Sequence, residues 1–338
     1  MSRGWAWVVV LVAFWAAAES AWASVPGMNG RIAYAWIGES AYRAGPTHTS
    51  IRSVDPRTRL VRVLRDCPLR PNAPAVYTDC SVGPPAYAPD GLSLAYPITR
   101  ITPDFTGQPW RFEPALGTMA PNGTSIDEHA TAHAYFAVAW SPAGDELLLE
   151  REARQPDDPD AHAIFLASRD RIESSQVTSV WTQAPDWSVR GEIAFGRYLH
   201  AQCLPMCEDI FITRLGGSSR RLTYRGGSNP SWSPHGTKVA FARRSRGQTN
   251  IYIVRRNGSG LRQVTRRGGY GPAWSPDGRW IAFIRNGGLY VIRTTGLGQR
   301  RLVQSGVTKS GEGPHVSSVD WQAITPRGGA RALPARTP

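Results

Sequence analysis

Short alternating strands dominate the hydrophobic pattern of this chain. After Gly278, Ile281 and Phe283 alternate with Ala282 and Ile284, a period of two that is rich in strand-forming side chains. Further strands at 289–292 and near 301–303 follow, separated by glycine-containing turns. With the short segment that enters at 272–274, this pattern predicts four antiparallel strands. One such sheet cannot bury both of its faces, so repeats are expected.

A tight-turn phrase precedes the strand at 281–284, and near-copies of it recur along the chain. In Trp274-Ser275-Pro276-Asp277-Gly278, proline presets the backbone of a type I turn and glycine closes it. Copies begin at Trp232, Trp140 and Tyr87, and a degenerate copy without proline begins at Trp187. Turn geometry explains the exposed Asp90 and Asp277, so we do not assign them a catalytic role.

The aromatic residues of these phrases recur with the period of a propeller blade. The six are Tyr87, Trp140, Trp187, Trp232, Trp274 and Trp321, with spacings of 53, 47, 45, 42 and 47 residues. The strand at 30–36 has no turn phrase before it, and the strand at 316–321 has none after it. We therefore predict an all-β, six-bladed β-propeller of four-stranded antiparallel blades. Its ring is closed by the N-terminal strands together with the C-terminal strand.

The phrases at 232–236 and 274–279, with the Ile-Ala-Phe strand at 281–283, resemble the TolB-like, WD-like β-propeller repeat family of bacterial envelope proteins. The resemblance covers nearly all of the mature chain, strongly over 226–304 and weakly over 30–220. It implies the propeller fold far more than any activity. TolB itself carries an additional domain before its propeller, for which the sequence before residue 30 leaves no room. The resemblance therefore does not imply TolB's role in energising the envelope.

The N-terminus has the pattern of a targeting segment. Arg3 precedes a short apolar run at 5–18, and Ala21-Trp22-Ala23 matches the small-x-small cleavage rule. We expect a signal peptide over 1–23, the propeller over 24–324 and a disordered tail over 325–338. An uncleaved signal anchor is the alternative. No other segment is apolar enough to span a bilayer, and both readings place the mature domain outside the cytoplasm: periplasmic, cell-surface or secreted.

Four cysteines in an exported chain favour disulfides. Cys67 and Cys80 flank a proline-rich insertion, and Cys203 and Cys207 lie between two predicted strands. Four cysteines allow three connectivities, of which the local pairs 67 with 80 and 203 with 207 need the least chain travel. A redox or metal role for Cys203 and Cys207 is the alternative, although their spacing is not that of thioredoxin-like sites.

The central channel is the place to look for chemistry. The residues just before the six aromatic residues should lie near it, and the polar ones among them are Asp186, Ser231 and Asp320. Because two carboxylates are few for a hard-cation site, we assign no catalytic residue, no metal ligand and no cofactor. Six-bladed lactonase-type enzymes do bind metal there, so a metal-dependent lactonase or hydrolase, or a lyase, is the alternative function.

Two histidines, His129 and His133, have the spacing of a zinc pair if their segment is helical. The order of residues is not that of a metalloprotease helix, and the segment precedes a predicted strand. We expect polar loops over 118–134 and 152–162, and we expect both histidines to lie in the first of these.

Charge is the most unusual feature of the composition. The net charge is +13, and residues 211–310 hold 19 basic residues against one acid, Asp277. A basic flank is predicted from the paired arginines Arg220, Arg221, Arg243, Arg244, Arg255, Arg256, Arg266 and Arg267. Such a flank fits an anionic partner, whereas no motif for reading nucleic acid is present. A compositional bias is the alternative, since arginine almost completely replaces lysine.

These patterns favour an exported, non-enzymatic binding or scaffold protein over an enzyme. It would present its channel mouth and basic flank to a protein or an anionic cell-envelope polymer. We expect it to act as a monomer without a transmembrane span in the mature chain.

Overall fold

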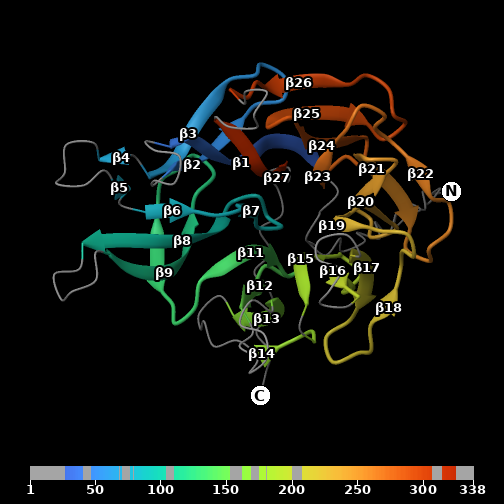
Figure 1. The fold of residues 1–338 in the computed structure, drawn as a ribbon, viewed down its shortest axis with the longest axis horizontal. Helices are drawn as coiled ribbons and strands as arrows, with labels where there is room; N and C mark the ends of the chain where they lie inside the picture. The colour runs from blue at the N-terminus through green and yellow to red at the C-terminus, as the bar shows by residue number, and fades with distance from the viewer. Residues whose placement is uncertain are drawn as a thin grey trace, which may run out of the picture.

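The computed structural model describes residues 27–40, 47–67, 69–70, 77–78, 80–103, 110–152, 162–168, 175–179, 181–199, 208–306 and 314–324. Six antiparallel sheets radiate from a central axis, as the view along that axis shows (Figure 1). Within the described ranges there are strands and turns but no helix, and hence no helix that could cross a membrane. The predicted all-β, six-bladed propeller is therefore confirmed.

Blades 3 to 6 each contain four consecutive strands, ordered from the axis to the rim as they follow along the chain. Blade 3 holds β11 (Tyr135–Trp140), β12 (Glu146–Glu152), β13 (His162–Ser168) and β14 (Ser175–Gln176). Blade 4 holds β15 (Thr182–Trp187), β16 (Ile193–Tyr198), β17 (Glu208–Thr213) and β18 (Arg220–Arg221). Blade 5 holds β19 (Ser228–Trp232), β20 (Lys238–Ser245), β21 (Gln248–Arg255) and β22 (Arg262–Gln263). Blade 6 holds β23 (Tyr270–Trp274), β24 (Trp280–Arg285), β25 (Gly288–Arg293) and β26 (Arg300–Val303).

Blade 1 closes the ring with both ends of the chain. The C-terminal β27 (His315–Ile324) is its inner strand and pairs antiparallel with β1 (Met28–Ser40), with Tyr34 opposite Val319. The blade continues with β2 (Thr47–Val54) and β3 (Val61–Cys67). This arrangement confirms the predicted closure, in which the last strand completes the first sheet.

Blade 2 has an inner strand in two pieces. Both β6 (Cys80–Val82) and β7 (Ala86–Tyr87) pair with β8 (Leu94–Pro103), which is followed outward by β9 (Trp110–Met119) and β10 (Asp127–Ala130). A separate two-stranded sheet of β4 (Leu69–Arg70) and β5 (Tyr77–Thr78) lies in the connection from blade 1.

The loop expected over 118–134 is only partly a loop. The segment 127–130 is the outer strand of blade 2, with Asp127 opposite Thr118 on β9. A strand at the rim of a blade faces water, so its polar sequence conceals it from a hydrophobicity pattern. His129 is exposed there, and its Nε2 lies 3.0 Å from Asp127 Oδ2. Most of the second expected loop, 152–162, lies outside the described residues.

The six aromatic residues form the contacts between blades. Each lies on an inner strand and is buried; five of them end their strand, and Trp321 lies within β27. Trp232 packs with Ala194 and Ile210 of the preceding blade, and Trp274 packs in the same way with Ile251. The repeat that is visible in the sequence is therefore a repeat of interblade packing.

The turn phrase serves the same fold. Ser275 is buried, and its Oγ accepts a hydrogen bond from the Trp280 amide at 2.8 Å, while the Gly278 amide donates to the Ser275 carbonyl at 2.8 Å. Gly278 has a φ of 67°, a conformation that favours glycine.

The expected Cys67–Cys80 disulfide is present and joins the end of β3 in blade 1 to the start of β6 in blade 2. Cys203 and Cys207 lie outside the described residues, as do the expected signal peptide and C-terminal tail.

We predict that Trp232→Ala lowers the free energy of unfolding by about 3–5 kcal/mol, because a fully buried indole leaves a cavity between two blades. Tyr224→Ala is the control, since the Tyr224 side chain is 70% exposed, and it should change stability by about 0.5 kcal/mol or less. Urea titration of the purified proteins measures both. Equal effects of the two substitutions would contradict the role assigned to the buried aromatic residues.

Candidate functional site

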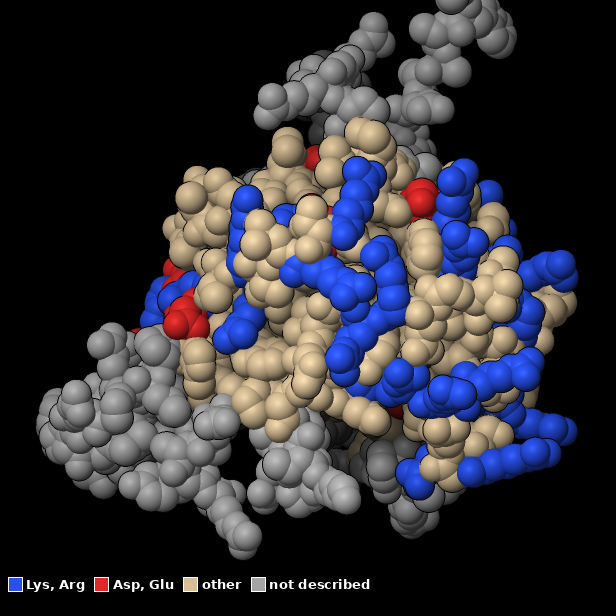
Figure 2. All heavy atoms as spheres, turned by 90° about the horizontal axis from the view of Figure 1, so that it is seen from above, with Lys and Arg blue, Asp and Glu red and all other residues tan. Residues whose placement is uncertain are grey.

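Basic side chains gather where blades 5 and 6 reach the surface. Figure 2 shows Lys and Arg crowding one side of the molecule, with few Asp or Glu among them. The eight arginines predicted as a basic flank lie in blades 4 and 5 and in the loop that leads to blade 6. Their contacts divide them into two groups.

Four of the eight make contacts inside the fold. Arg220 donates from Nη2 to the carbonyl of Arg256 at 2.5 Å, and Arg256 forms a 3.0 Å ion pair with the buried Glu192. Both contacts join blade 4 to blade 5. Arg221 pairs with the buried Asp209. These arginines hold the blades together, and their charges are partly compensated.

Arg243, the fourth, belongs to a repeated stack. Its guanidinium lies 5.6 Å from the centre of the Tyr252 ring, which in turn stacks on Phe241 at 6.0 Å. Blades 4 and 6 repeat the same Arg, aromatic and Phe arrangement with Arg197, Phe211 and Phe195, and with Arg285, Tyr290 and Phe283. The Phe-x-Arg spacing in the second strands of blades 4, 5 and 6 is a sequence signal for this arrangement, which was not among the predictions.

The other four, Arg244, Arg255, Arg266 and Arg267, are exposed. None of them forms an ion pair with an acid in the part of the chain that the structure describes. These arginines carry charge that no acid among the described residues compensates by an ion pair.

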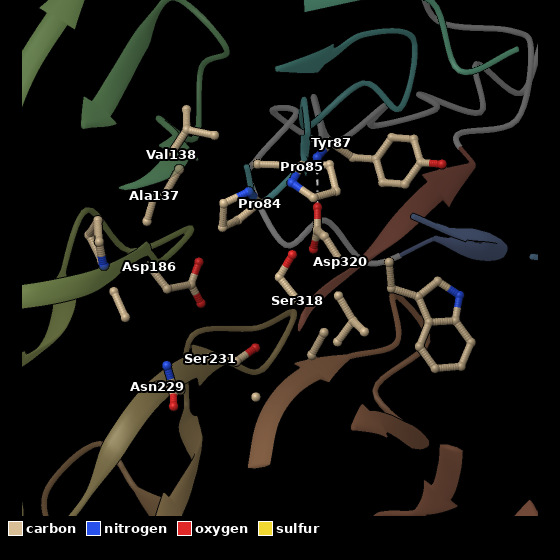
Figure 3. A pocket seen from close by; sticks show the side chains of 18 of the residues that line it. Pro84, Pro85, Tyr87, Ala137, Val138, Asp186, Asn229, Ser231, Ser318 and Asp320 are labelled. Carbon is tan, nitrogen blue, oxygen red and sulfur yellow. Dashed lines mark hydrogen bonds between the residues drawn. The ribbon is translucent and has the colours of Figure 1, made fainter. Parts of the chain in front are cut away.

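A cavity of about 360 Å³ runs along the propeller axis and is lined by the inner strands of all six blades (Figure 3). We call the six buried aromatic residues the anchors. The residues that directly precede them all line the cavity: Ala86, Ala139, Asp186, Ser231, Ala273 and Asp320. Successive side chains of a strand point to opposite faces of the sheet, so the residue before a buried aromatic residue faces the following blade. Its position on the innermost strand brings it to the cavity wall.

The three polar residues among them also connect neighbouring blades. Asp320 Oδ2 accepts a hydrogen bond from the Tyr87 amide at 2.6 Å, and Asp186 Oδ2 accepts one from the Trp232 amide at 2.5 Å. Ser231 Oγ accepts a longer one, 3.4 Å, from Trp274. In each case the acceptor lies one blade before the anchor that it holds. This geometry gives the two aspartates a structural role in the ring.

Burial changes the protonation of both aspartates. It raises the pKa of Asp186 to about 7, with a further contribution from the charge of Asp320, and it raises the pKa of Asp320 to about 6. Main-chain amide donors oppose both shifts. Both carboxyl groups point into the cavity, as does the Ser318 hydroxyl between them (Figure 3). That hydroxyl is buried and has no hydrogen-bond partner among the described residues.

A second acidic group lies where blades 3 and 4 meet at the cavity wall. Glu150 accepts a 2.7 Å hydrogen bond from the Ala184 amide, and its other oxygen lies 3.0 Å from His162 Nδ1. The His162 ring stacks on Phe136 at 4.5 Å. Burial and the nearby Glu150 raise the pKa of Glu208 to about 7.

The cavity is thus acidic inside a basic protein, because its described lining includes Glu150, Asp186 and Asp320 but neither Lys nor Arg. Such a wall accepts hydrogen bonds and favours neutral or cationic groups. Among the described residues, no cluster of three or more His, Cys, Asp or Glu could hold a metal ion.

Bulges in the inner strands of blades 4, 5 and 6 shape part of the wall of this cavity. Ala184, Asn229 and Gly271 have φ values of 49°, 49° and 54°, and each precedes a proline that also lines the cavity. The ladders of these strands shift register at the same place. A proline two residues before the aromatic residue, as at 185, 230 and 272, is a sequence signal for this wall.

We predict that Asp186→Asn changes how stability depends on pH. Because the folded-state pKa is raised, folded Asp186 keeps a proton that the unfolded chain releases between about pH 4 and pH 7. Its contribution is therefore most favourable near pH 4 and is lost as the pH rises to 7. The free energy of unfolding of the variant, relative to that of the original protein, should therefore rise by on the order of 2 kcal/mol from pH 5 to pH 8. Urea unfolding at each pH measures this difference.

Asp186→Ala separates the charge from the hydrogen bond. Asparagine can still accept the Trp232 amide and alanine cannot, so the alanine variant should be the less stable of the two at every pH. Stability curves of Asp186→Asn and the original protein that run parallel across this pH range would contradict the assignment.

No protein-family model matches the chain, and no curated protein matches its sequence. Solved structures do match its fold. TolB from Acinetobacter baumannii is 17% identical with a TM-score of 0.62, over 87% of this chain and 66% of that one. A putative TolB from Agrobacterium tumefaciens is 16% identical with a TM-score of 0.56, over 87% of this chain and 100% of that one.

A chain of a nidogen/laminin complex also matches, at 8% identity and a TM-score of 0.58, over 86% of this chain and 98% of that one. The present chain spans just under two thirds of the Acinetobacter protein. At these identities the comparisons show the fold alone: this chain is similar in structure to TolB-like six-bladed β-propellers.

Proposed function

We propose that this protein is an exported, non-enzymatic binding propeller that captures an anionic partner on its basic flank, next to the channel mouth. The observation that carries the proposal is the basic excess of residues 211–310 together with its exposure in blades 4 to 6. Within the described residues, the exposed arginines of the flank form no ion pair, so a partner would supply the opposite charge.

The channel supports a binding role more than a catalytic one. Asp186 and Asp320 each hold an amide of the next blade, which accounts for both carboxylates without a substrate. The structural neighbours are consistent with a binding role, since one of them is solved in a nidogen/laminin complex, an assembly of proteins.

Export rests on three observations: the N-terminal targeting pattern, the disulfide between Cys67 and Cys80, and the fold shared with TolB proteins. We predict that the protein recovered from the periplasm or medium of a bacterial host begins at Ser24. Amino-terminal sequencing tests this prediction. A protein that keeps Met1 and stays with the membrane would instead indicate a signal anchor.

The binding function predicts salt-sensitive retention on anionic matrices. The mature protein should bind immobilised poly-L-glutamate and polygalacturonate at low salt, and its affinity should fall steeply with ionic strength because exposed charges are screened. The variant Arg244→Ser/Arg255→Ser/Arg266→Ser/Arg267→Ser should bind about tenfold more weakly, given roughly 0.2–1 kcal/mol for each exposed pair.

A matched variant removes four exposed arginines from blades 1 and 2: Arg57, Arg59, Arg62 and Arg111. It loses the same net charge but should keep most of the affinity. Retention that does not respond to salt, or equal losses in both variants, would contradict capture by the flank.

A further inference from the structure

Two loops with the same sequence pattern lead into the channel mouth. Arg225-Gly226-Gly227 precedes the inner strand of blade 5, and Arg267-Gly268-Gly269 precedes that of blade 6. Neither loop belongs to the turn phrase from which the fold was predicted. The two loops occupy corresponding places in consecutive blades.

The same hydrogen bonds hold both loops. Asp209 Oδ1 accepts the Gly226 amide at 3.0 Å, and Asn250 Oδ1 accepts the Gly268 amide at 3.0 Å. In both blades the same side-chain oxygen also accepts a threonine hydroxyl, from Thr223 at 2.7 Å and from Thr265 at 3.2 Å. Arg225 and Arg267 are therefore presented from corresponding, fixed backbones.

The β20–β21 hairpin lies beside the second loop, because the Gly269 amide donates to the Thr249 carbonyl at 2.9 Å. The hairpin carries the exposed Arg244 and Arg246. Arg246 has a φ of 52° in the turn, where Asn or Gly is the usual residue, as in Asn286-Gly287 of the next blade. A long cationic side chain thus occupies a turn position that asparagine or glycine usually fills.

The two loops and the hairpin together carry five exposed arginines at this end of blade 5: Arg225, Arg244, Arg246, Arg266 and Arg267. There is no Asp or Glu between residues 210 and 276 of the sequence. None of the five has an ion-pair partner in the described part of the chain. We call these five residues the mouth arginines.

The described residues that line the channel mouth beside these arginines are uncharged, whereas the lining farther along the channel is acidic. Tyr270 directly follows the second loop, and Asn229 follows the first after Ser228; both line the cavity and are exposed, with Tyr270 at 38%. Asp186 and Asp320 lie farther along their own inner strands, directly before the aromatic residues, and their carboxyl groups point into the cavity (Figure 3). An anionic chain is therefore attracted to the mouth arginines but excluded from the channel. A ligand that suits both regions has carboxylates outside and an uncharged side chain over Tyr270.

We propose that the mouth arginines and Tyr270 form a docking site for an acidic segment of a partner protein. Arginine forks bind carboxylates, and a protein segment alternates acidic with uncharged side chains as this surface requires. Arginine and tyrosine are also the residue types that contribute most to protein interfaces. This inference rests on the proposed function and assigns it a partner class and a place.

The test uses the mature protein and two fluorescent peptides, one of alternating Glu and Gly and one with a central Leu added. Fluorescence anisotropy at low salt gives the dissociation constants. The variant Arg225→Ser/Arg244→Ser/Arg267→Ser should bind both peptides about tenfold more weakly. Tyr270→Ala should abolish the affinity gained from the central Leu while leaving the all-Glu/Gly peptide nearly unchanged.

The matched control removes three exposed basic residues from the opposite ends of the strands: Arg214→Ser/Lys238→Ser/Arg279→Ser. It has the same net charge as the first variant and should bind within about twofold of the original protein, because each exposed charge contributes little at a distance. Circular dichroism and urea unfolding establish that both variants are folded.

Equal losses in the two triple variants would overturn the docking site and leave the broader anionic function standing. Tighter binding of polygalacturonate than of either peptide, lost in the same first variant, would reassign the site to a polysaccharide. Failure of the original protein to bind any of these anionic probes would contradict the proposed function itself.

Discussion

The fold depends on packing one aromatic ring between each pair of neighbouring blades. A single four-stranded blade exposes two apolar faces, and the ring of six buries them all only if the last strand completes the first blade. The aromatic residues fill the blade interfaces near the axis, from Tyr87 in blade 2 to Trp321 in blade 1. Removing one ring affects two blades at once, so the stability of each blade depends on its neighbours.

The same alternation that packs each aromatic ring against the preceding blade turns the side chain before it toward the following blade. Where that residue is Asp186 or Asp320, its carboxylate holds the amide of the next blade's anchor. The channel wall is thus also part of the interblade contact, and its acidity follows from the way in which the ring is held. Raised pKa values in this channel need no catalytic explanation, because burial produces them.

The arginine excess has two distinct physical uses. Arg221, Arg243 and Arg256 stack on rings or pair with buried acids, which contributes to the fold. Arg244, at the end of β20, and Arg267, in the loop before β23, are exposed and have no ion-pair partner among the described residues. Adjacent arginines in the sequence therefore have different roles. Arg243 stacks on Tyr252 of its own blade, whereas Arg244 is exposed to solvent.

The sequence by itself determined the number of blades, the strand order and the closure, because these follow from local turn chemistry and from a period of about 45 residues typical of propeller blades. It also placed Asp186, Ser231 and Asp320 beside the anchors, and the innermost position of their strands then brings them to the cavity wall. Only the tertiary structure decided what each polar group contacts. The bond from the Tyr87 amide to Asp320 joins residues 233 positions apart. The hydrophobic pattern likewise does not predict the outer strand at 127–130, since a strand at the solvated rim needs no apolar side chains. Side-chain partners depend on how distant segments pack, and no local pattern encodes that packing.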